Sequence, residues 1–222
     1  MAEHVLDLSA RFIDSGRVDS PPNRVTHELS EIADGVALVE AFSHVVVVST
    51  DDGLVAFDSS GPASGSRVLE SLRQWNREPF HTLVYTHGHI DHVGGSSAFA
   101  RDAESFGCPV PRVIGHENLS PRLRRYRATN GYNKVINARQ FGGLPTSTLS
   151  GANSDRPFVP DGTLEPVVDY SDTMTDEIGG IEFQFHHALG ETDDHTWTWI
   201  PQHRMISAGD QFIWNFPNCG NP

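Results

Sequence analysis

The first half of the chain alternates short apolar runs with turn residues, and this pattern predicts β-strands. The expected strands cover residues 26–32, 36–41, 45–50, 54–58 and 82–86. The run at 45–50 opens with four valines, so we expect it to be buried on both faces. Apolar positions at helical spacing predict a helix over 64–75, and another helix is expected over 96–104.

The second half of the chain begins with a polar, basic segment and then returns to a strand pattern. One or two helices are expected over 117–140, broken at Asn130-Gly131, and 142–165 is expected to be a long loop. Further strands are expected at residues 111–115, 167–170, 174–178, 181–187, 195–200 and 204–208. The last five of these should form a second β half that packs against the first.

Length and composition favour one domain, residues 1–222, with many turns. The chain has 20 glycines and 14 prolines, and its net charge is −13. This charge argues against nucleic acid or an anionic membrane as the main partner, although a metal centre could still attract an anionic substrate. Cys108 and Cys219 form no disulfide framework, and a single bridge between them stays open. With no leader pattern and no long apolar run, we expect a cytoplasmic protein.

The most informative stretch follows the strand at 82–86, where four ligand-type side chains fall within six positions. They are His87, His89, Asp91 and His92, and two glycines come after them. His87 and His89 are two residues apart, so they point the same way in an extended segment. Surface histidines without a role are the ordinary alternative, but such residues at the mouth of a buried strand are costly to desolvate unless something binds them. The stretch therefore predicts a metal site.

This His-x-His-x-Asp-His pattern resembles the metal-binding signature of the metallo-β-lactamase superfamily. The resemblance runs in order from about Thr26 to Asp210. It implies an α+β fold, a four-layer αββα sandwich, with a hydrolytic site for one or two metals at the sheet edge. It also implies two divalent metals, zinc by preference, with iron and manganese as alternatives.

The resemblance assigns further site residues at later strand ends. Glu191 stands where the superfamily usually has a histidine ligand, and Asp210 stands at the place of its bridging carboxylate. His186 and His187 are alternative ligands. Asp58 would support the metal loop by hydrogen bonding, its ordinary alternative being a residue of a helix N-terminal turn. His195 is expected to orient a carboxylate rather than to bind metal.

A carboxylate at position 191 is also used by the alkylsulfatase-like branch of the superfamily. The insertion, about 116–165, is rich in Arg, Tyr and Asn and holds seven of the chain's 16 lysines and arginines. We expect it to lie over the metal face and to clamp a sulfate group through planar, bidentate contacts. The predicted substrate-binding residues are Arg122, Arg125, Tyr126, Tyr132, Asn133 and Arg139. The ordinary alternative for each arginine is a solvated helix face.

The superfamily pattern requires one more histidine, after a further strand and helix, which does not occur before Pro222. We therefore expect a fragment whose second half is truncated, or an incomplete second metal site. The first metal would take His87, His89 and Glu191, and the second would take Asp91 and His92, with Asp210 between them. On this basis the chain alone should be a poor catalyst unless another histidine, such as His116 or His187, completes the site.

The leading hypothesis is a metal-dependent hydrolase in which a metal-activated hydroxide attacks an alkyl sulfate or similar ester. Asp91 would hold or shuttle the proton, as the resemblance implies. The first alternative is a hydrolase of the same fold acting on lactones, β-lactams, thioesters or phosphodiesters. The second is a non-hydrolytic metal-binding or redox module. The expected partner is a small-molecule ester, and a homo-oligomer is possible.

Overall fold

The computed structural model describes residues 3–20, 23–140, 155–213 and 216–217, so most of the expected loop at 142–165 and Cys219 lie outside the described residues. Its largest element is a seven-stranded sheet in which neighbouring strands follow chain order. The strands are β1 (Leu29–Ala33), β2 (Val36–Val39), β3 (Val45–Thr50), β4 (Gly53–Phe57), β5 (Phe80–Val84), β6 (Arg112–His116) and β7 (Val168–Tyr170). Pairing is antiparallel from β1 to β4 and parallel from β4 to β7.

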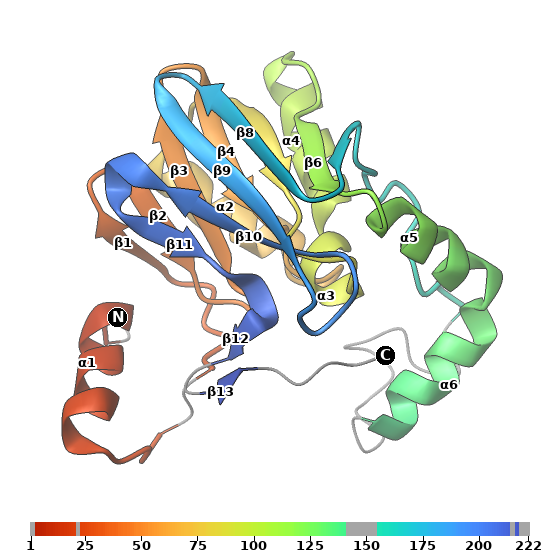
Figure 1. Ribbon diagram of the computed structural model, residues 1–222, viewed down its shortest axis with the longest axis horizontal. Helices are drawn as coiled ribbons and strands as arrows, with labels where there is room; N and C mark the ends of the chain where they lie inside the picture. Colours follow the sequence, from red (N-terminus) through yellow and green to blue (C-terminus); the bar gives the residue numbers. More distant parts are fainter. Residues whose placement is uncertain (1–2, 21–22, 141–154, 214–215, 218–222) are drawn as a thin grey trace.

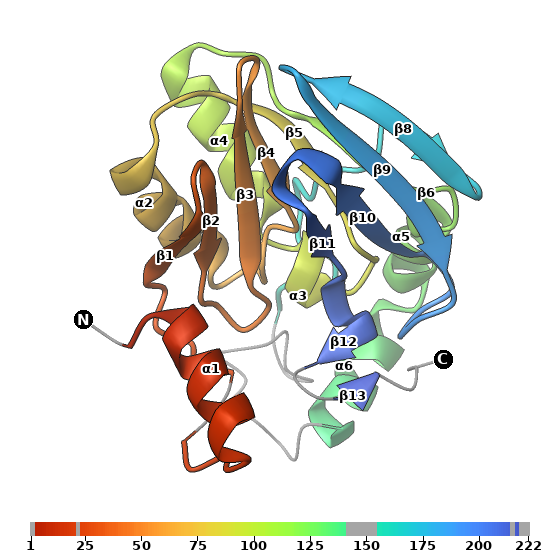
Figure 2. The same ribbon diagram turned by 60° about the vertical axis from the view of Figure 1, so that its left-hand side comes forward.

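A second, antiparallel sheet lies against one face of the first (Figure 1). Its strands are β11 (Met205–Ser207), β10 (His195–Ile200), β9 (Ile181–Ala188) and β8 (Thr173–Ile178), in this spatial order. Short 3-10 turns, η1 (Pro201–His203) and η2 (Gly209–Gln211), flank β11, and a small hairpin of β12 (Phe212–Ile213) and β13 (Phe216–Pro217) follows. The hairpin lies below the two sheets (Figure 2).

The described residues form six helices, two of which cover the other face of the first sheet (Figure 1). The helices are α1 (Val5–Ser15), α2 (Gly65–Trp75), α3 (Ile90–Val93), α4 (Ser96–Phe106), α5 (Leu119–Ala128) and α6 (Asn130–Gln140). Of these, α2 and α4 pack side by side behind the sheet, whereas α5 and α6 extend away from its β6 side (Figure 1). Among the described residues, no helix lies on the outer face of the second sheet, so three of the four expected layers are present (Figures 1 and 2).

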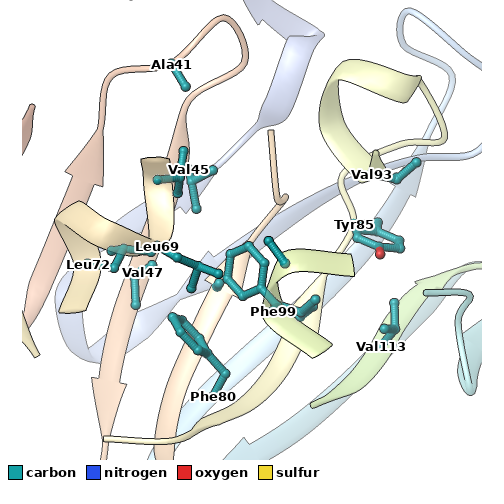
Figure 3. Packing of buried hydrophobic residues seen from close by; sticks show 14 of the residues in the cluster. Ala41, Val45, Val47, Leu69, Leu72, Phe80, Tyr85, Val93, Phe99 and Val113 are labelled. Carbon is teal, nitrogen blue, oxygen red and sulfur yellow. The ribbon is translucent and has the colours of Figure 1, made fainter. Parts of the chain in front are cut away.

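Two apolar cores hold these layers together. The first lies between the helices and the sheet, where Leu69 and Leu72 of α2 and Phe99 of α4 meet Val47 and Phe80 (Figure 3). The second lies between the two sheets and includes Val48, Phe57, Val84, Phe183 and Phe185. Removing each such side chain from water contributes about 1.5–3 kcal/mol, so the alternating strands and the helical spacing largely determine the layers.

The expected elements agree with the structure, with one clear correction. The helix break in 117–140 is present between α5 and α6, and the paired sheets confirm the expected α+β sandwich. The strand expected at 167–170 was assigned to the second β half, but β7 pairs in parallel with β6 in the first sheet. A run this short carries no sequence signal for which sheet it joins, because either edge would bury Tyr170.

Candidate metal centre

The predicted metal-binding side chains gather at one edge of the first sheet, where the parallel strands β4 and β5 end side by side. The segment after β5 places His87 in the interior, and His89 is the N-cap of the short helix α3. Asp91 and His92 lie on that helix, and His92 is buried. Parallel strands bring their carboxyl ends to the same edge, so residues following β4 and β5 meet there.

A first group of donor atoms consists of His87, His89 and Glu191. Glu191 Oε2 lies 3.2 Å from His87 Nε2 and 3.3 Å from His89 Nδ1. This oxygen is buried and has no hydrogen-bond partner. Burial lowers the pKa of His87 well below its ordinary value, so its ring is neutral and can offer a lone pair. Burial raises the pKa of the Glu191 carboxyl, but its contacts with His87 and His89 have the larger combined effect. The pKa of this carboxyl is therefore lowered from its ordinary value.

A second group consists of His87, His92 and Asp210. His92 Nε2 lies 3.4 Å from Asp210 Oδ2 and 3.5 Å from Asp91 Oδ2. Burial alone would lower the pKa of His92, but the surrounding carboxylates of Asp58, Asp91 and Asp210 raise it well above its ordinary value. Three acidic side chains around one imidazole make a strongly negative pocket, which favours a cation.

Asp58 directly follows β4 and supports this edge of the sheet through hydrogen bonds. Its carboxylate accepts hydrogen bonds from the backbone N–H of Thr86 at 2.8 Å and from the Thr86 hydroxyl at 2.7 Å. Its Oδ2 also lies 2.7 Å from His92 Nδ1. Asp58 itself has a left-handed backbone, with φ of 63°, which is uncommon outside glycine. The structure thus places Asp58 as a hydrogen-bonding support for His92, not in a helix turn.

The segment that carries Asp210 is seated against Thr86. Gly209 has φ of +51°, and a Cβ there would lie 2.5 Å from Thr86 Cβ, so only glycine fits. His195 Nε2 lies 2.9 Å from the carbonyl oxygen of Ala208, and its ring stacks on His87 with centroids 4.9 Å apart. His195 is expected to orient a carboxylate; its partner is instead a backbone carbonyl, because its ring faces Ala208 in the connection between β11 and η2.

Ser43 also belongs to the site, and the sequence contains no signal for it. Its hydroxyl oxygen lies 2.6 Å from Asp91 Oδ2, to which it donates a hydrogen bond, and 3.1 Å from His92 Nε2. Ser43 lies in the turn between β2 and β3, far along the chain from the histidine motif. Only the folding of that turn over the sheet edge brings it to the carboxylate.

A cavity of about 390 Å³ opens beside the second group. Its polar end is formed by Ser43, Asp91, His92 and Asp210. Its apolar wall is formed by Phe42, Val46, Phe57, Ile206 and Phe212. Phe42, Ile206 and Phe212 are all exposed and gather on this one wall, and an exposed apolar patch of this kind is typical of a binding surface.

The predicted substrate-binding residues do not line this cavity. Arg122 is buried and paired with Asp193 and Asp194, so it is not available as a sulfate clamp. Asn133 donates its side-chain hydrogen bonds to the Tyr126 carbonyl and the Thr129 hydroxyl. The other four lie on α5 and α6, and a substrate role for them stays a prediction: Arg125, Tyr126, Tyr132 and Arg139.

The alternative histidines lie outside both donor groups. The His186 ring stacks on Trp197 at 4.1 Å, and the His187 ring stacks on His116 at 3.8 Å. His116 Nε2 lies 3.0 Å from the Ser171 carbonyl oxygen, and His187 Nε2 lies 3.0 Å from that of Asp193. The structure therefore gives these three rings packing and backbone contacts, not a place among the donors.

The fold and the two histidine–carboxylate groups define an α+β sandwich with a metal-binding edge. Residues 38–213 match the Metallo-beta-lactamase superfamily, and the chain belongs to this superfamily. It is 23% identical over 171 residues to a linear primary-alkylsulfatase of Pseudomonas sp. (strain ATCC 19151), covering 74% of this chain and 32% of that protein. It is 30% identical over 96 residues to the 2,4-dinitroanisole O-demethylase subunit alpha of Nocardioides sp. (strain JS1661), covering 42% and 27%.

Solved structures share the fold. A metallo-β-lactamase of Cronobacter sakazakii with a HARLDQ motif superposes with a TM-score of 0.59 at 18% identity, over 88% of this chain and 66% of that one. A stereoselective inverting sec-alkylsulfatase of Pseudomonas sp. superposes with a TM-score of 0.54 at 18% identity, over 79% and 30%. The chain spans about a third or less of the length of the alkylsulfatase and the O-demethylase subunit that it matches. No described helix has the length and apolar character needed to cross a membrane.

The donor set fits a divalent metal ion. The orphaned, buried Oε2 of Glu191 faces two imidazole nitrogens, an arrangement that leaves a buried charge without a hydrogen bond unless a cation joins it. Imidazole nitrogen and carboxylate oxygen are ligands of zinc and similar ions. The two groups of three donors could therefore each hold a metal ion.

Proposed function

We propose that this protein is a metal-dependent hydrolase of alkyl sulfate or closely similar esters. The single observation that carries the proposal is the adjacency of the His92–Asp91–Asp210 donors to an apolar-walled cavity. A charged, metal-binding end and an apolar end match the two parts of an alkyl sulfate. The similarity to the linear primary-alkylsulfatase supports the same substrate class.

Two divalent ions, zinc by preference, would be held by the first group, His87, His89 and Glu191, and by the second group, in which Asp91 adds a carboxylate beside His92 and Asp210. When bound, such ions act as Lewis acids and lower the pKa of water so that it attacks an ester at neutral pH. Asp91 is the residue placed to take up a proton, because its Oδ2 faces the cavity beside His92. Ser43 orients that oxygen by donating a hydrogen bond at 2.6 Å.

The apolar wall determines how the substrate is oriented. Phe42 and Phe212 would cover an alkyl chain of moderate length, and burial of each methylene contributes about 0.8 kcal/mol to binding. The chain would extend away from the donors and leave the sulfate next to His92 and Asp210. Binding energy from the chain would thus hold the ester in the reacting position.

Release of sulfate from octyl sulfate tests this proposal. The protein is stripped with EDTA, reloaded with Zn²⁺ or Mn²⁺, and assayed by ion chromatography, with Asp91→Asn as the matched variant. We expect sulfate release that requires metal and falls about 100-fold or more in Asp91→Asn. Absence of metal-dependent sulfate release, with turnover of a lactone or thioester instead, would contradict the substrate class.

A second candidate is cleavage of an alkyl aryl ether. It is favoured by the 30% identity over 96 residues to the 2,4-dinitroanisole O-demethylase subunit alpha. The same apolar wall would then hold an aromatic ring. Including 2,4-dinitroanisole in the assay separates the two candidates, because the release of dinitrophenolate is visible without sulfate analysis.

A further inference from the structure

A buried ion pair joins α5 to the loop that carries Glu191. Arg122 Nε donates to Asp194 Oδ1 at 3.1 Å, and Arg122 Nη2 donates to Asp193 Oδ1. Asp194 is fully buried, and the Arg122 side chain is 7% exposed. Its remaining nitrogen, Nη1, donates to the hydroxyl of Tyr126 at 3.3 Å. Every nitrogen of the guanidinium is thus occupied within the protein.

The second carboxylate oxygen of Asp194 reaches the histidine motif itself. Asp194 Oδ2 accepts a hydrogen bond from the backbone N–H of Gly88 at 2.9 Å. Gly88 lies between His87 and His89, so this contact fixes the peptide that sets the spacing of two donors. A Cβ at position 88 would lie 2.8 Å from Arg122 Cδ and 2.8 Å from Asp194 Oδ2. Only a glycine allows the pair to approach so closely.

The same carboxylate also organises its own loop. The hydroxyl of Thr192 donates to Asp194 Oδ1, and Thr192 directly follows Glu191. Asp194 therefore binds both segments of the first donor group: the His87–His89 segment through Gly88, and the Glu191 segment through Thr192. Arg122 holds this carboxylate in place by charge and by the fixed direction of its N–H groups.

We propose that Arg122 and Asp194 are positioning residues that set the distance between Glu191 and the His87–His89 pair, and with it the metal affinity of the first group. The inference rests on the proposed function, because it assumes that this group holds a metal. It assigns Arg122 to the protein's interior instead of to a sulfate. Partners that orient ligands typically change metal affinity by about 10- to 100-fold when they are removed.

Asp194→Asn is the deciding variant because it keeps the size of the side chain. The amide must turn an N–H toward either Gly88 N–H or Arg122 Nε, so at least one of the two hydrogen bonds is lost. Arg122→Lys keeps the charge but loses the planar fork, and Arg124→Ala on the exposed side of α5 is the matched control. Folding of each metal-free variant is checked by circular dichroism and thermal unfolding.

The measurement is a Co²⁺ titration of the full 222-residue chain, followed through the visible ligand-field bands. We expect Asp194→Asn to bind Co²⁺ about 10- to 100-fold more weakly and with altered bands, Arg122→Lys to lie between, and Arg124→Ala to match the unchanged protein. Unchanged affinity and bands in folded Asp194→Asn would overturn the proposal. Unfolding of metal-free Asp194→Asn would overturn it as well, since the pair would then support the whole fold.

This test stands apart from the test of the proposed function. If the unchanged protein binds Co²⁺ but releases no sulfate, the substrate class is wrong while the positioning role is still measured. If the unchanged protein binds no Co²⁺ at all, the metal assignment fails, and with it both proposals.

Discussion

His92 directs its two ring nitrogens to different tasks: Nδ1 lies 2.7 Å from Asp58 Oδ2, while Nε2 faces Asp91 and Asp210. Asp58 also binds the N–H and hydroxyl of Thr86, so the same carboxylate fixes the loop and the ring. A ring whose Nδ1 donates a proton to a carboxylate offers Nε2 as the ligand atom. The position of Asp58 therefore prepares His92 for a cation.

Replacing Asp58 with asparagine should weaken the second group and leave the first group almost unchanged. The amide N–H would face His92 Nδ1 and favour the tautomer with its proton on Nε2, the atom needed for metal. We expect metal affinity of the second group to fall about 10- to 100-fold. A Zn²⁺ titration by calorimetry measures the affinity of each site. If both sites of Asp58→Asn keep the affinities that they have in the unchanged protein, the prediction is wrong.

Gly209 can be tested against a glycine of similar backbone conformation. Gly209→Ala should cost about 1–2 kcal/mol for the left-handed backbone, plus about 1–3 kcal/mol for overpacking against Thr86. At Gly107, φ is +66° and a Cβ would meet nothing within 4 Å, so Gly107→Ala should lose only the stability that the left-handed backbone costs. Urea unfolding of both alanine variants gives the difference. Equal losses of stability would show that the close approach to Thr86 has no energetic consequence.

His89→Ala should remove the metal from the first group with little effect on the metal-free fold. Its side chain is 17% exposed and touches His87, so its loss should lower the free energy of unfolding by about 1 kcal/mol, the ordinary effect of a single substitution. His186→Ala is the control, because its ring packs on Trp197 away from both groups. Elemental analysis checks both variants; metal lost in His186→Ala and retained in His89→Ala would reverse the assignment.

Phe42 should contribute to substrate binding more than to folding. The residue is 44% exposed and lines the cavity, so Phe42→Ala should raise KM for octyl sulfate about fivefold, which corresponds to about 1 kcal/mol of lost apolar contact. Ethyl sulfate, with a chain too short to reach the wall, should show a smaller change. Phe106→Ala, on the far end of α4, is the control. An equal rise in KM for both esters would argue against an alkyl subsite.

Much of this centre follows from local sequence. His87, His89, Asp91 and His92 fall within six positions after a buried strand, so the end of that strand and the turn of α3 that follows bring them to one edge. Glu191 and Asp210 were placed by their positions after later strands and by resemblance to the superfamily; the structure brings both to the histidines. Their meeting depends on the packing of the two sheets, which the alternating apolar pattern already favoured.

Other features depend on contacts that no local pattern records. Ser43 reaches Asp91 across 48 positions, and Arg122 reaches Asp194 across 72. The basic sequence of 117–140 predicts a helix that faces a substrate, because a charge pattern does not show which carboxylates pair with each arginine. The burial of Arg122 against two aspartates reverses that interpretation, since its charge is already paired and each of its three nitrogens already donates a hydrogen bond within the protein. Likewise, the three residues of β7 do not reveal which sheet they join.

Elemental analysis of the purified chain beside His87→Ala tests whether this edge of the sheet holds divalent metal. His87 belongs to both donor groups, so a single substitution disturbs both. We predict at least one zinc, manganese or iron ion per chain in the unchanged protein, removable by EDTA and restored by added metal, and a nearly metal-free His87→Ala. A chain that takes up no metal, or a His87→Ala variant that keeps the same metal content, would show that this edge is not a metal centre.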